Sequence, residues 1–365
     1  MSSTVTFLGD YNLDVVVRPD EYSVKGNAFW FRQNGQERLL TVTDLTPDRP
    51  QILPGSKSRS HENIDEIVQG LTIESEDDGG GGQKSARVWR EFGNGYADNG
   101  TYADIGKRTQ RLARSLSTAK IEGLFLGARE PLTHLILNIE DLSRPERPRD
   151  YFLFRPQKFP LVSELDQEFS VQLRRDIQNR NALMLNSPKD LAFVSYALES
   201  AGPDIPIYAN LTKSFPRAFG IRNVLPRANV LFSRVDLLRY ARTLFGDDTM
   251  VPNNDLMMSA VWNAMGKPKD DRFFIVTLGS EGALGQDRRG RYHVGLAESY
   301  RNDIQPHLVK ALGAGDNFIA YAMHAHLDKG IKRVDEIMQY ATQGVLTHMG
   351  FAENVPSSAY VIERA

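Results

Sequence analysis

The chain has 365 residues, with 44 lysines and arginines against 46 aspartates and glutamates. A formal net charge of −2 argues against nucleic-acid binding driven by global charge, and the lack of cysteine excludes disulfides, thiolate metal sites and a cysteine nucleophile. The first residues reach Asp10 before a long apolar run develops, and no stretch holds the roughly 18 apolar residues of a membrane span. We therefore expect a soluble, cytoplasmic protein of two or three domains, or one large α/β domain, with neither nucleic acid nor membrane as partner.

Two short apolar runs, 5–8 and 15–17, open the chain and are separated by the polar turn that begins at Gly9. They predict a buried strand, a turn and a continuing strand. Farther on, Asn34-Gly35 stands between two apolar segments, which is the strongest local signal for a hairpin. We expect a β-hairpin over 27–43.

Residues 44–78 differ in composition, with three prolines, a basic and serine-rich stretch at 56–60 and an acidic run at 74–78. Little in this segment can build a core, so it predicts a polar insertion that carries one short helix at 62–69. The alternative interpretation is a lid or a partner-binding loop.

The rest of the chain alternates between strand and helix patterns. We expect helices at 83–92 and 104–116 on either side of a Gly/Asn-rich loop at 94–100, and then strands at 135–139 and 151–154. In the second half we expect strands at 182–185, 205–208, 229–232 and 273–278 and helices at 189–199, 235–244, 315–327 and 334–349. This alternation predicts an α/β fold, with a mainly parallel sheet covered by helices on both faces.

The segment Gly313-Ala314-Gly315-Asp316 is the sharpest candidate for chemistry. Two glycines around Ala314 allow a tight backbone at a helix N-terminus, and this arrangement favours an anion such as phosphate. A carboxylate beside an anion site makes sense if Asp316 accepts a proton from a hydroxyl that attacks phosphorus. The alternative is that Asp316 only caps the helix.

Several motifs occur in an order that resembles the ribokinase-like carbohydrate kinases, the PfkB family. The Gly-Ala-Gly-Asp segment resembles the family's C-terminal signature, and Gly9-Asp10-Tyr11-Asn12-Leu13-Asp14 is similar to its Gly-x-x-Asn-x-Asp pattern. The other similar segments are the Gly-Gly helix at 79–93, the central hairpin at 133–155, the strand and turn at 276–283, and the closing helix and tail at 341–356. The matches cover nearly the whole chain.

The resemblance implies a ribokinase-like core with a small β-lid that closes over the acceptor. The core would comprise 1–14 and 79–365, the lid hairpin 15–43 and the insertion 44–78, with part of the lid returning near 133–155. In this family the lid hairpins often pair between subunits, so the resemblance also implies a homodimer formed through the lid.

The implied activity is transfer of the γ-phosphate of ATP, with Mg²⁺, to a hydroxyl of a sugar, sugar acid or nucleoside. Asp316 would be the general base, and Gly313, Ala314 and Gly315 would form the anion hole. The acceptor would meet Asn12, Asp14, Gly79, Gly80, Lys84 and Arg155. The nucleotide would meet Ser233, Asp236, Thr277, Gly279 and Gly282, and Asp236 would also bind the metal.

Some positions depart from the family pattern. Lys310-Ala311 replaces an Asp-Thr pair before the signature, and Ser233 with Asp236 replaces an Asn-x-x-Glu motif. A catalytically degenerate relative that acts as a binding or scaffolding protein is therefore the alternative function. His324 and His326 are two positions apart on one helix and face different sides, so we expect packing or surface roles rather than a shared metal.

Overall fold

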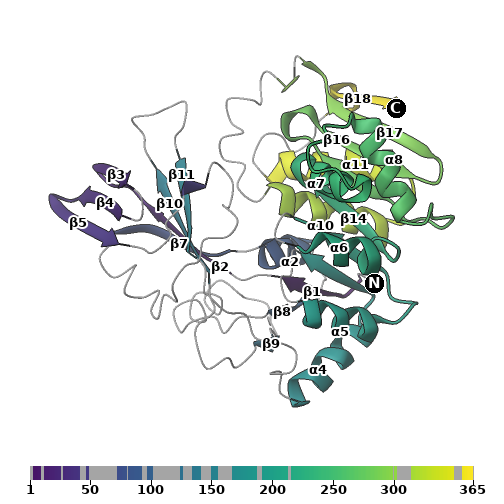
Figure 1. Ribbon diagram of the computed structural model, residues 1–365, viewed down its shortest axis with the longest axis horizontal. Helices are drawn as coiled ribbons and strands as arrows, with labels where there is room; N and C mark the ends of the chain where they lie inside the picture. The colour runs from purple at the N-terminus through teal and green to yellow at the C-terminus, as the bar shows by residue number, and fades with distance from the viewer. Residues whose placement is uncertain are drawn as a thin grey trace.

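The computed structural model describes residues 3–9, 12–25, 28–41, 47–48, 72–79, 81–92, 97–101, 124–125, 134–140, 149–154, 167–186, 191–212, 215–298, 300–301, 314–348 and 356–364. Within these ranges the core is one ten-stranded sheet (Figure 1). Its strands, in spatial order, are β18 (Tyr360–Arg364), β17 (Gly290–Leu296), β16 (Ala283–Asp287), β15 (Phe274–Thr277), β14 (Ala228–Ser233), β13 (Ile207–Asn210), β12 (Ala182–Asn186), β1 (Val5–Gly9), β8 (Ala97–Thr101) and β9 (Leu124–Phe125). The strands from β9 to β15 are parallel, and β16, β17 and β18 continue the sheet antiparallel.

The central strands are apolar on both faces because helices cover both faces of the sheet. In β12, Ala182 and Met184 pack into one hydrophobic cluster, while Leu183 and Leu185 pack into the other. All five residues of this strand are buried. Such a continuous apolar run is typical of a parallel strand enclosed on two sides, where each large side chain contributes about 1.5–3 kcal/mol on burial.

Seven longer helices form the outer layers of the described part. One face of the sheet is covered by α4 (Gln167–Gln178), α5 (Leu191–Ala201), α7 (Arg234–Phe245) and α8 (Asn254–Ala264). The other face is covered by α2 (Gly81–Glu91), α10 (Ala314–Leu327) and α11 (Val334–His348). Short helical turns occur at α6 (Arg217–Phe219), η2 (Gly220–Val224), η3 (Gly279–Glu281) and η5 (Ser357–Ala359).

Helices α10 and α11 pack at very close range. A Cβ atom at Gly344 of α11 would lie 2.1 Å from the Tyr321 ring of α10, so only glycine fits at this crossing. Helix α10 also contacts α2 extensively, and together these contacts hold the first turn of α10 in place above the sheet.

Two smaller sheets stand apart from the core, on the left of Figure 1. One has the strand order β6 (Pro47–Asp48), β11 (Arg149–Phe154), β10 (His134–Glu140), β2 (Asn12–Val17) and β7 (Ile73–Gly79). The other is an antiparallel sheet of β3 (Glu21–Lys25), β4 (Ala28–Gln33) and β5 (Gln36–Thr41). The hairpin predicted over 27–43 is confirmed, and Asn34 and Gly35 at its turn have φ of 53° and 73°.

Two sequence predictions are wrong. The acidic run at 74–78, assigned to the polar insertion, forms most of strand β7, which lies at the edge of its sheet and pairs with β2. Charged side chains are common on edge strands because they discourage pairing with other chains. The loop predicted at 94–100 instead contains most of β8, which pairs in parallel with β1. The helices predicted at 62–69 and 104–116 lie outside the described residues.

The predicted fold class is confirmed, since a mainly parallel sheet lies between two helical layers and smaller sheets flank it. None of the helices in the described ranges combines the length and the apolar character that crossing a membrane requires.

Candidate active site

Polar residues end four neighbouring parallel strands of the core. Strand β12 ends in Asn186, β13 in Asn210, β14 in Ser233 and β15 in Thr277. The carboxyl ends of parallel strands lie along one edge of a sheet, which is where open α/β proteins bind their ligands. We call this side of the core the carboxyl edge.

Asp316 lies in the first turn of α10 and is joined to the carboxyl edge by hydrogen bonds. Asn186 donates from Nδ2 to Asp316 Oδ1 over 3.1 Å and to Ser85 Oγ over 3.1 Å. Ser85 donates in turn to the main-chain oxygen of Asp316 over 3.1 Å. These bonds fix the position of the carboxylate relative to both the sheet and α2.

Asn210 completes this network from the next strand. Its Nδ2 donates to Asn186 Oδ1 over 2.9 Å, so the orientation of the Asn186 amide is set by its neighbour. Asn186 is only 1% exposed, and buried carboxamides that pair in this way hold one fixed geometry. The resulting arrangement is a carboxylate held rigidly at the positive end of a helix dipole.

The helix-cap interpretation of Asp316 does not account for its bond to the sheet. Ala314 and Gly315 are the first two residues of α10 and Asp316 is the third, so Asp316 lies inside the helix rather than before it. Its described side-chain bond goes to Asn186 of the sheet. The space where a side chain at 315 would project is open, and the first amide groups of any helix lack partners within the helix. Gly313 lies outside the described residues.

The predicted nucleotide residues gather farther along the same edge. Ser233 and Thr277 are register partners in β14 and β15, and η3 begins at Gly279 directly after β15. Gly279 has a φ of 65°, and Gly282 has a φ of 97° with no room for a Cβ beside the Val294 carbonyl. Both positions therefore require glycine, and they bend the chain sharply at the end of the strand.

Ser233 and Asp236 bind each other at the start of α7. Ser233 Oγ accepts from the Asp236 amide over 3.2 Å and donates to the Asp236 carboxylate. These two hydrogen bonds cap α7 and engage both side chains. Asp236 is only 7% exposed. No cluster of three metal-binding side chains occurs among the residues whose placement is described.

Of the predicted acceptor residues, the backbones of Asn12, Asp14, Gly79 and Lys84 are described, and they lie where the core meets the smaller sheets. Asn12 of β2 is the register partner of Gly79 of β7, and α2, which carries Lys84, begins two residues after Gly79. Lys84 immediately precedes Ser85, so it lies one residue from the Asp316 network. The side chains of Asn12 and Asp14 lie outside the described part of the structure, as do Gly80 and Arg155.

Sequence reasoning missed Ser85, Asn186 and Asn210. The two asparagines did leave a signal, because each is a polar residue that ends an otherwise apolar strand. Ser85 gave no such signal, since a small polar residue is ordinary inside a helix.

Comparison with known proteins supports the fold. No family model and no curated protein matches the sequence. Among solved structures, adenosine kinase of Trypanosoma brucei brucei aligns with a TM-score of 0.66 at 13% identity, over 96% of this chain and 99% of that chain. Ribokinase of Thermotoga maritima aligns with a TM-score of 0.60 at 12% identity, over 98% and 97% of the chains. Ribokinase of Giardia lamblia aligns with a TM-score of 0.57 at 14% identity, over 98% and 96%. The chain therefore has a ribokinase-like fold, as its motifs predicted.

Proposed function

We propose that this protein is a kinase that transfers the γ-phosphate of ATP to a hydroxyl of a sugar, a sugar acid or a nucleoside. The observation that carries the proposal is the placement of Asp316, a carboxylate fixed by Asn186 at the first turn of α10. The likeness of the fold to a ribokinase and an adenosine kinase supports the same class of reaction.

In the proposed reaction Asp316 accepts the proton of the acceptor hydroxyl as its oxygen attacks the γ-phosphorus. The bond from that phosphorus to the bridging oxygen breaks, and ADP leaves. Main-chain amides of Gly313, Ala314 and Gly315 would stabilise the negative charge on the transferring group. The bond from Asn186 keeps Asp316 in one orientation, which lowers the entropic cost of reaching the reactive geometry.

The two substrates would lie on either side of Asp316. ATP would extend along the ends of β14 and β15, where Thr277, Gly279 and Gly282 form the turn. The acceptor would lie toward the smaller sheets, close to Asn12, Asp14, Gly79, Gly80, Lys84 and Arg155. A lid formed by these sheets would exclude water, and pairing of two lids would give a homodimer.

The side chain predicted to bind Mg²⁺ is already engaged within the protein. Mg²⁺ usually keeps several waters and takes one or two carboxylates together with substrate phosphates. Asp236, the predicted metal ligand, is buried and engaged with Ser233 in the helix cap. The ion would therefore arrive on the phosphates of ATP, where its chemistry is to neutralise their charge, and we assign no step to it.

The second candidate function is a binding or scaffolding protein that retains the fold without catalysis. One observation favours it: Ser233 and Asp236 are used in capping α7, at the place where the family organises its metal and phosphates. Lys310-Ala311 in place of Asp-Thr points in the same direction.

The test compares Asp316→Asn with Asp255→Asn. Both aspartates lie in the first turn of a helix, but Asp255 is exposed on α8 and pairs with Arg291. Formation of ADP is measured with a panel of sugars, sugar acids and nucleosides. Asp316→Asn should lower turnover by roughly 10²–10⁴ and leave substrate affinity within a few-fold, because asparagine is no base. Asp255→Asn should retain wild-type turnover.

Two different outcomes would contradict the proposed function, and each has its own meaning. Unchanged turnover in Asp316→Asn would remove the proposed base. A wild-type protein that binds ATP but forms no ADP with any acceptor would favour the scaffolding alternative.

A further inference from the structure

Strand β18 ends the core sheet, and β17 is its only neighbouring strand in the described part of the chain. It lies beside the C-terminus on the right of Figure 1, whereas the two smaller sheets lie on the left. We call the side of β18 that faces away from β17 its outer side. The residues from Val361 to Arg364 are all exposed, so little of the protein covers this strand.

The main-chain groups of β18 alternate between β17 and the outer side. Just before the strand, the Ala359 carbonyl accepts a hydrogen bond from the Ala297 amide over 2.7 Å, and these two residues continue the register between β17 and β18. In an antiparallel pair only every second residue bonds to the partner strand. Counting on from Ala359, alternate residues of β18 direct their N–H and C=O groups to the outer side: Tyr360, Ile362 and Arg364.

Apolar side chains occupy the middle of this strand. Val361 is 41% exposed and Ile362 is 46% exposed, and both are β-branched, as residues that pair well in sheets are. Edge strands commonly avoid association through prolines, bulges or charge. Strand β18 contains no proline, and it pairs with β17 without a shift of register.

Strand β7, at the edge of its own sheet, is protected in a way that β18 is not. Four of its seven residues are acidic, so a second copy of β7 would be repelled. Strand β18 carries one acid, Glu363, and one base, Arg364. Its charges balance, and they leave the outer side open to pairing.

We propose that β18 pairs antiparallel with β18 of a second copy of this chain, about a two-fold axis at Ile362. The register follows from the main chain, because outward-facing residues must lie opposite one another to exchange hydrogen bonds. Ile362 then lies opposite Ile362 of the second copy, and Tyr360 lies opposite its Arg364. A shift by two residues in either direction would leave one of these rows unpaired.

The pairing joins two core sheets into one. Tyr360 donates from its hydroxyl to Gln343 of α11 over 2.9 Å, so Ile362, two residues on, lies on the same face of the strand. The two Ile362 side chains would cover each other there. A contact of this size is small for a stable interface, so we expect association in the micromolar range. It is separate from any dimer formed through the lid.

Sedimentation velocity over a concentration series, without ATP or acceptor, tests the association. The mass of the wild type should rise with concentration across the micromolar range. Ile362→Lys sets two ammonium groups opposite each other and should weaken association by about tenfold or more. Val171→Lys is the matched control, because Val171 is 53% exposed but lies on α4, and it should associate as the wild type does.

Two proline variants test the direction of the main-chain groups. Ile362→Pro removes an amide that faces the outer side, so it should weaken association by about tenfold or more and leave the unfolding midpoint near that of the wild type. Val361→Pro removes an amide that bonds to β17, so it should lower the unfolding midpoint.

Single cysteines test the register. The chain contains no cysteine, so each introduced thiol reports one contact. In Ile362→Cys the two thiols lie opposite each other, at a Cα separation of about 5.5 Å that a disulfide spans. Val361→Cys is the matched control, because Val361 lies opposite Glu363 of the second copy and its two thiols are too far apart, with Cα atoms more than about 7 Å from each other. Mild oxidation should therefore give covalent dimers of Ile362→Cys alone on a non-reducing gel.

Three results would each overturn the proposal. The first is a wild type of constant mass over the whole concentration series, which would mean that another chain or none covers β18. The second is association that Ile362→Lys does not weaken. The third is equal cross-linking of the two cysteine variants.

Discussion

The polar side chains at the two edges of the core sheet, where its parallel strands end and begin, differ in how they are hydrogen-bonded. At the carboxyl edge, Asn210, Asn186 and Ser85 pair in sequence and end on Asp316. At the amino edge, where the parallel strands begin, the buried Nε2 of His326 has no hydrogen-bond partner among the described residues. Polar groups that are paired within the protein hold a fixed geometry, whereas a buried polar group without a partner carries the cost of its lost hydration.

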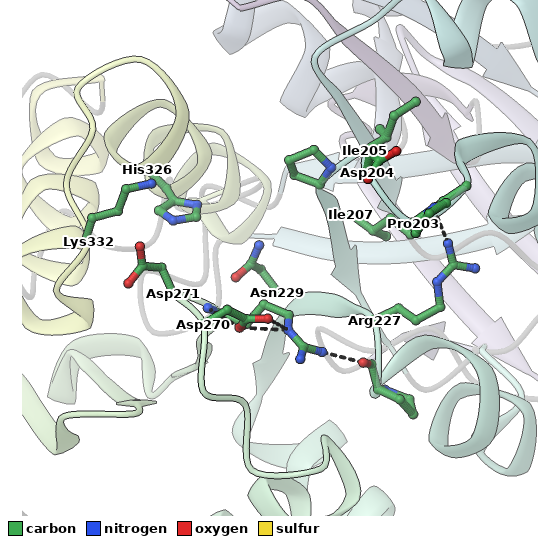
Figure 2. Close-up of a pocket in the computed structure, with 14 residues that line it drawn as sticks. Pro203, Asp204, Ile205, Ile207, Arg227, Asn229, Asp270, Asp271, His326 and Lys332 are labelled. Atoms are coloured by element: carbon green, nitrogen blue, oxygen red, sulfur yellow. Dashed lines mark hydrogen bonds and ion pairs between the residues drawn. The ribbon is translucent and has the colours of Figure 1, made fainter.

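The same two elements join both edges. Strand β13 begins with Ile207, which lines a cavity at the amino edge (Figure 2), and ends with Asn210 in the Asp316 network. Helix α10 carries Asp316 in its first turn and His326 in its last. A point substitution at one edge leaves β13 and α10 in place, and these are the elements that support the other edge.

The largest effect on stability is expected when the carboxyl-edge network is broken by Asn186→Leu. Leucine has a similar size but removes the hydrogen bonds that the buried Asn186 makes with Asn210, Ser85 and Asp316, so stability should fall by about 3 kcal/mol in urea unfolding. If the proposed function holds, kcat should fall about tenfold or more while KM changes little, because Asn186 acts by orienting Asp316.

A double variant separates positioning from general destabilisation. In an Asp316→Asn background, adding Asn186→Leu should lower kcat only slightly further, since the group that Asn186 orients has already lost its function. Fully multiplicative losses of kcat would contradict the positioning role.

At the amino edge, stability should depend on pH through His326. Its pKa is about 4 in the folded protein and near 6.5 in the unfolded chain, so between these values only the unfolded chain takes up the proton. Stability should therefore decrease as the pH falls from about 6.5 to 4, by about 3 kcal/mol at most. Urea unfolding of His326→Asn across this range should lack that part of the decrease. Parallel curves for the two proteins would contradict the lowered pKa.

The smallest effect concerns the cap that shares the carboxyl edge with Asp316. Ser233→Ala should cost about 1 kcal/mol of stability, as should Asn253→Ala, which removes the equivalent cap of α8. ATP binding should change less than about threefold in both variants if Ser233 serves only as a cap. A loss of ATP affinity specific to Ser233→Ala would instead indicate direct contact with the nucleotide.

Local signals in the sequence predicted the fold well. The alternation of strands and helices predicted the parallel sheet, and Asn34-Gly35 predicted its hairpin because both residues tolerate the positive φ of the turn. The prediction that His324 and His326 face different sides of α10 is confirmed, since His324 stacks on Phe92 and His326 is hydrogen-bonded to Tyr208. Strand β8 was missed because its Gly/Asn-rich sequence lacks strand propensity, and its pairing with β1 decides its structure.

The candidate site was only partly predictable. Asp316 stood out because its neighbours are glycines at a helix start. Asn186 could not be assigned to it, because the contact depends on the register that sets Asn186 opposite Gly9 and on the packing of α10 above both. The unpaired Nε2 of His326 could not be predicted either, since hydrogen-bond pairing is a property of the assembled structure.

The central position of β1 has a consequence for synthesis of the chain. Val5 pairs with Ala97 on one side and with Ala182 on the other, so β1 is made well before both of the strands that flank it. At ribosomal rates of roughly 5–20 residues per second, β1 waits on the order of ten seconds or more before β12 emerges. Throughout this time at least one edge of an apolar strand stays unpaired and exposed to other chains. We expect the nascent protein to depend on chaperones during this interval, more than its finished and fully enclosed core would suggest.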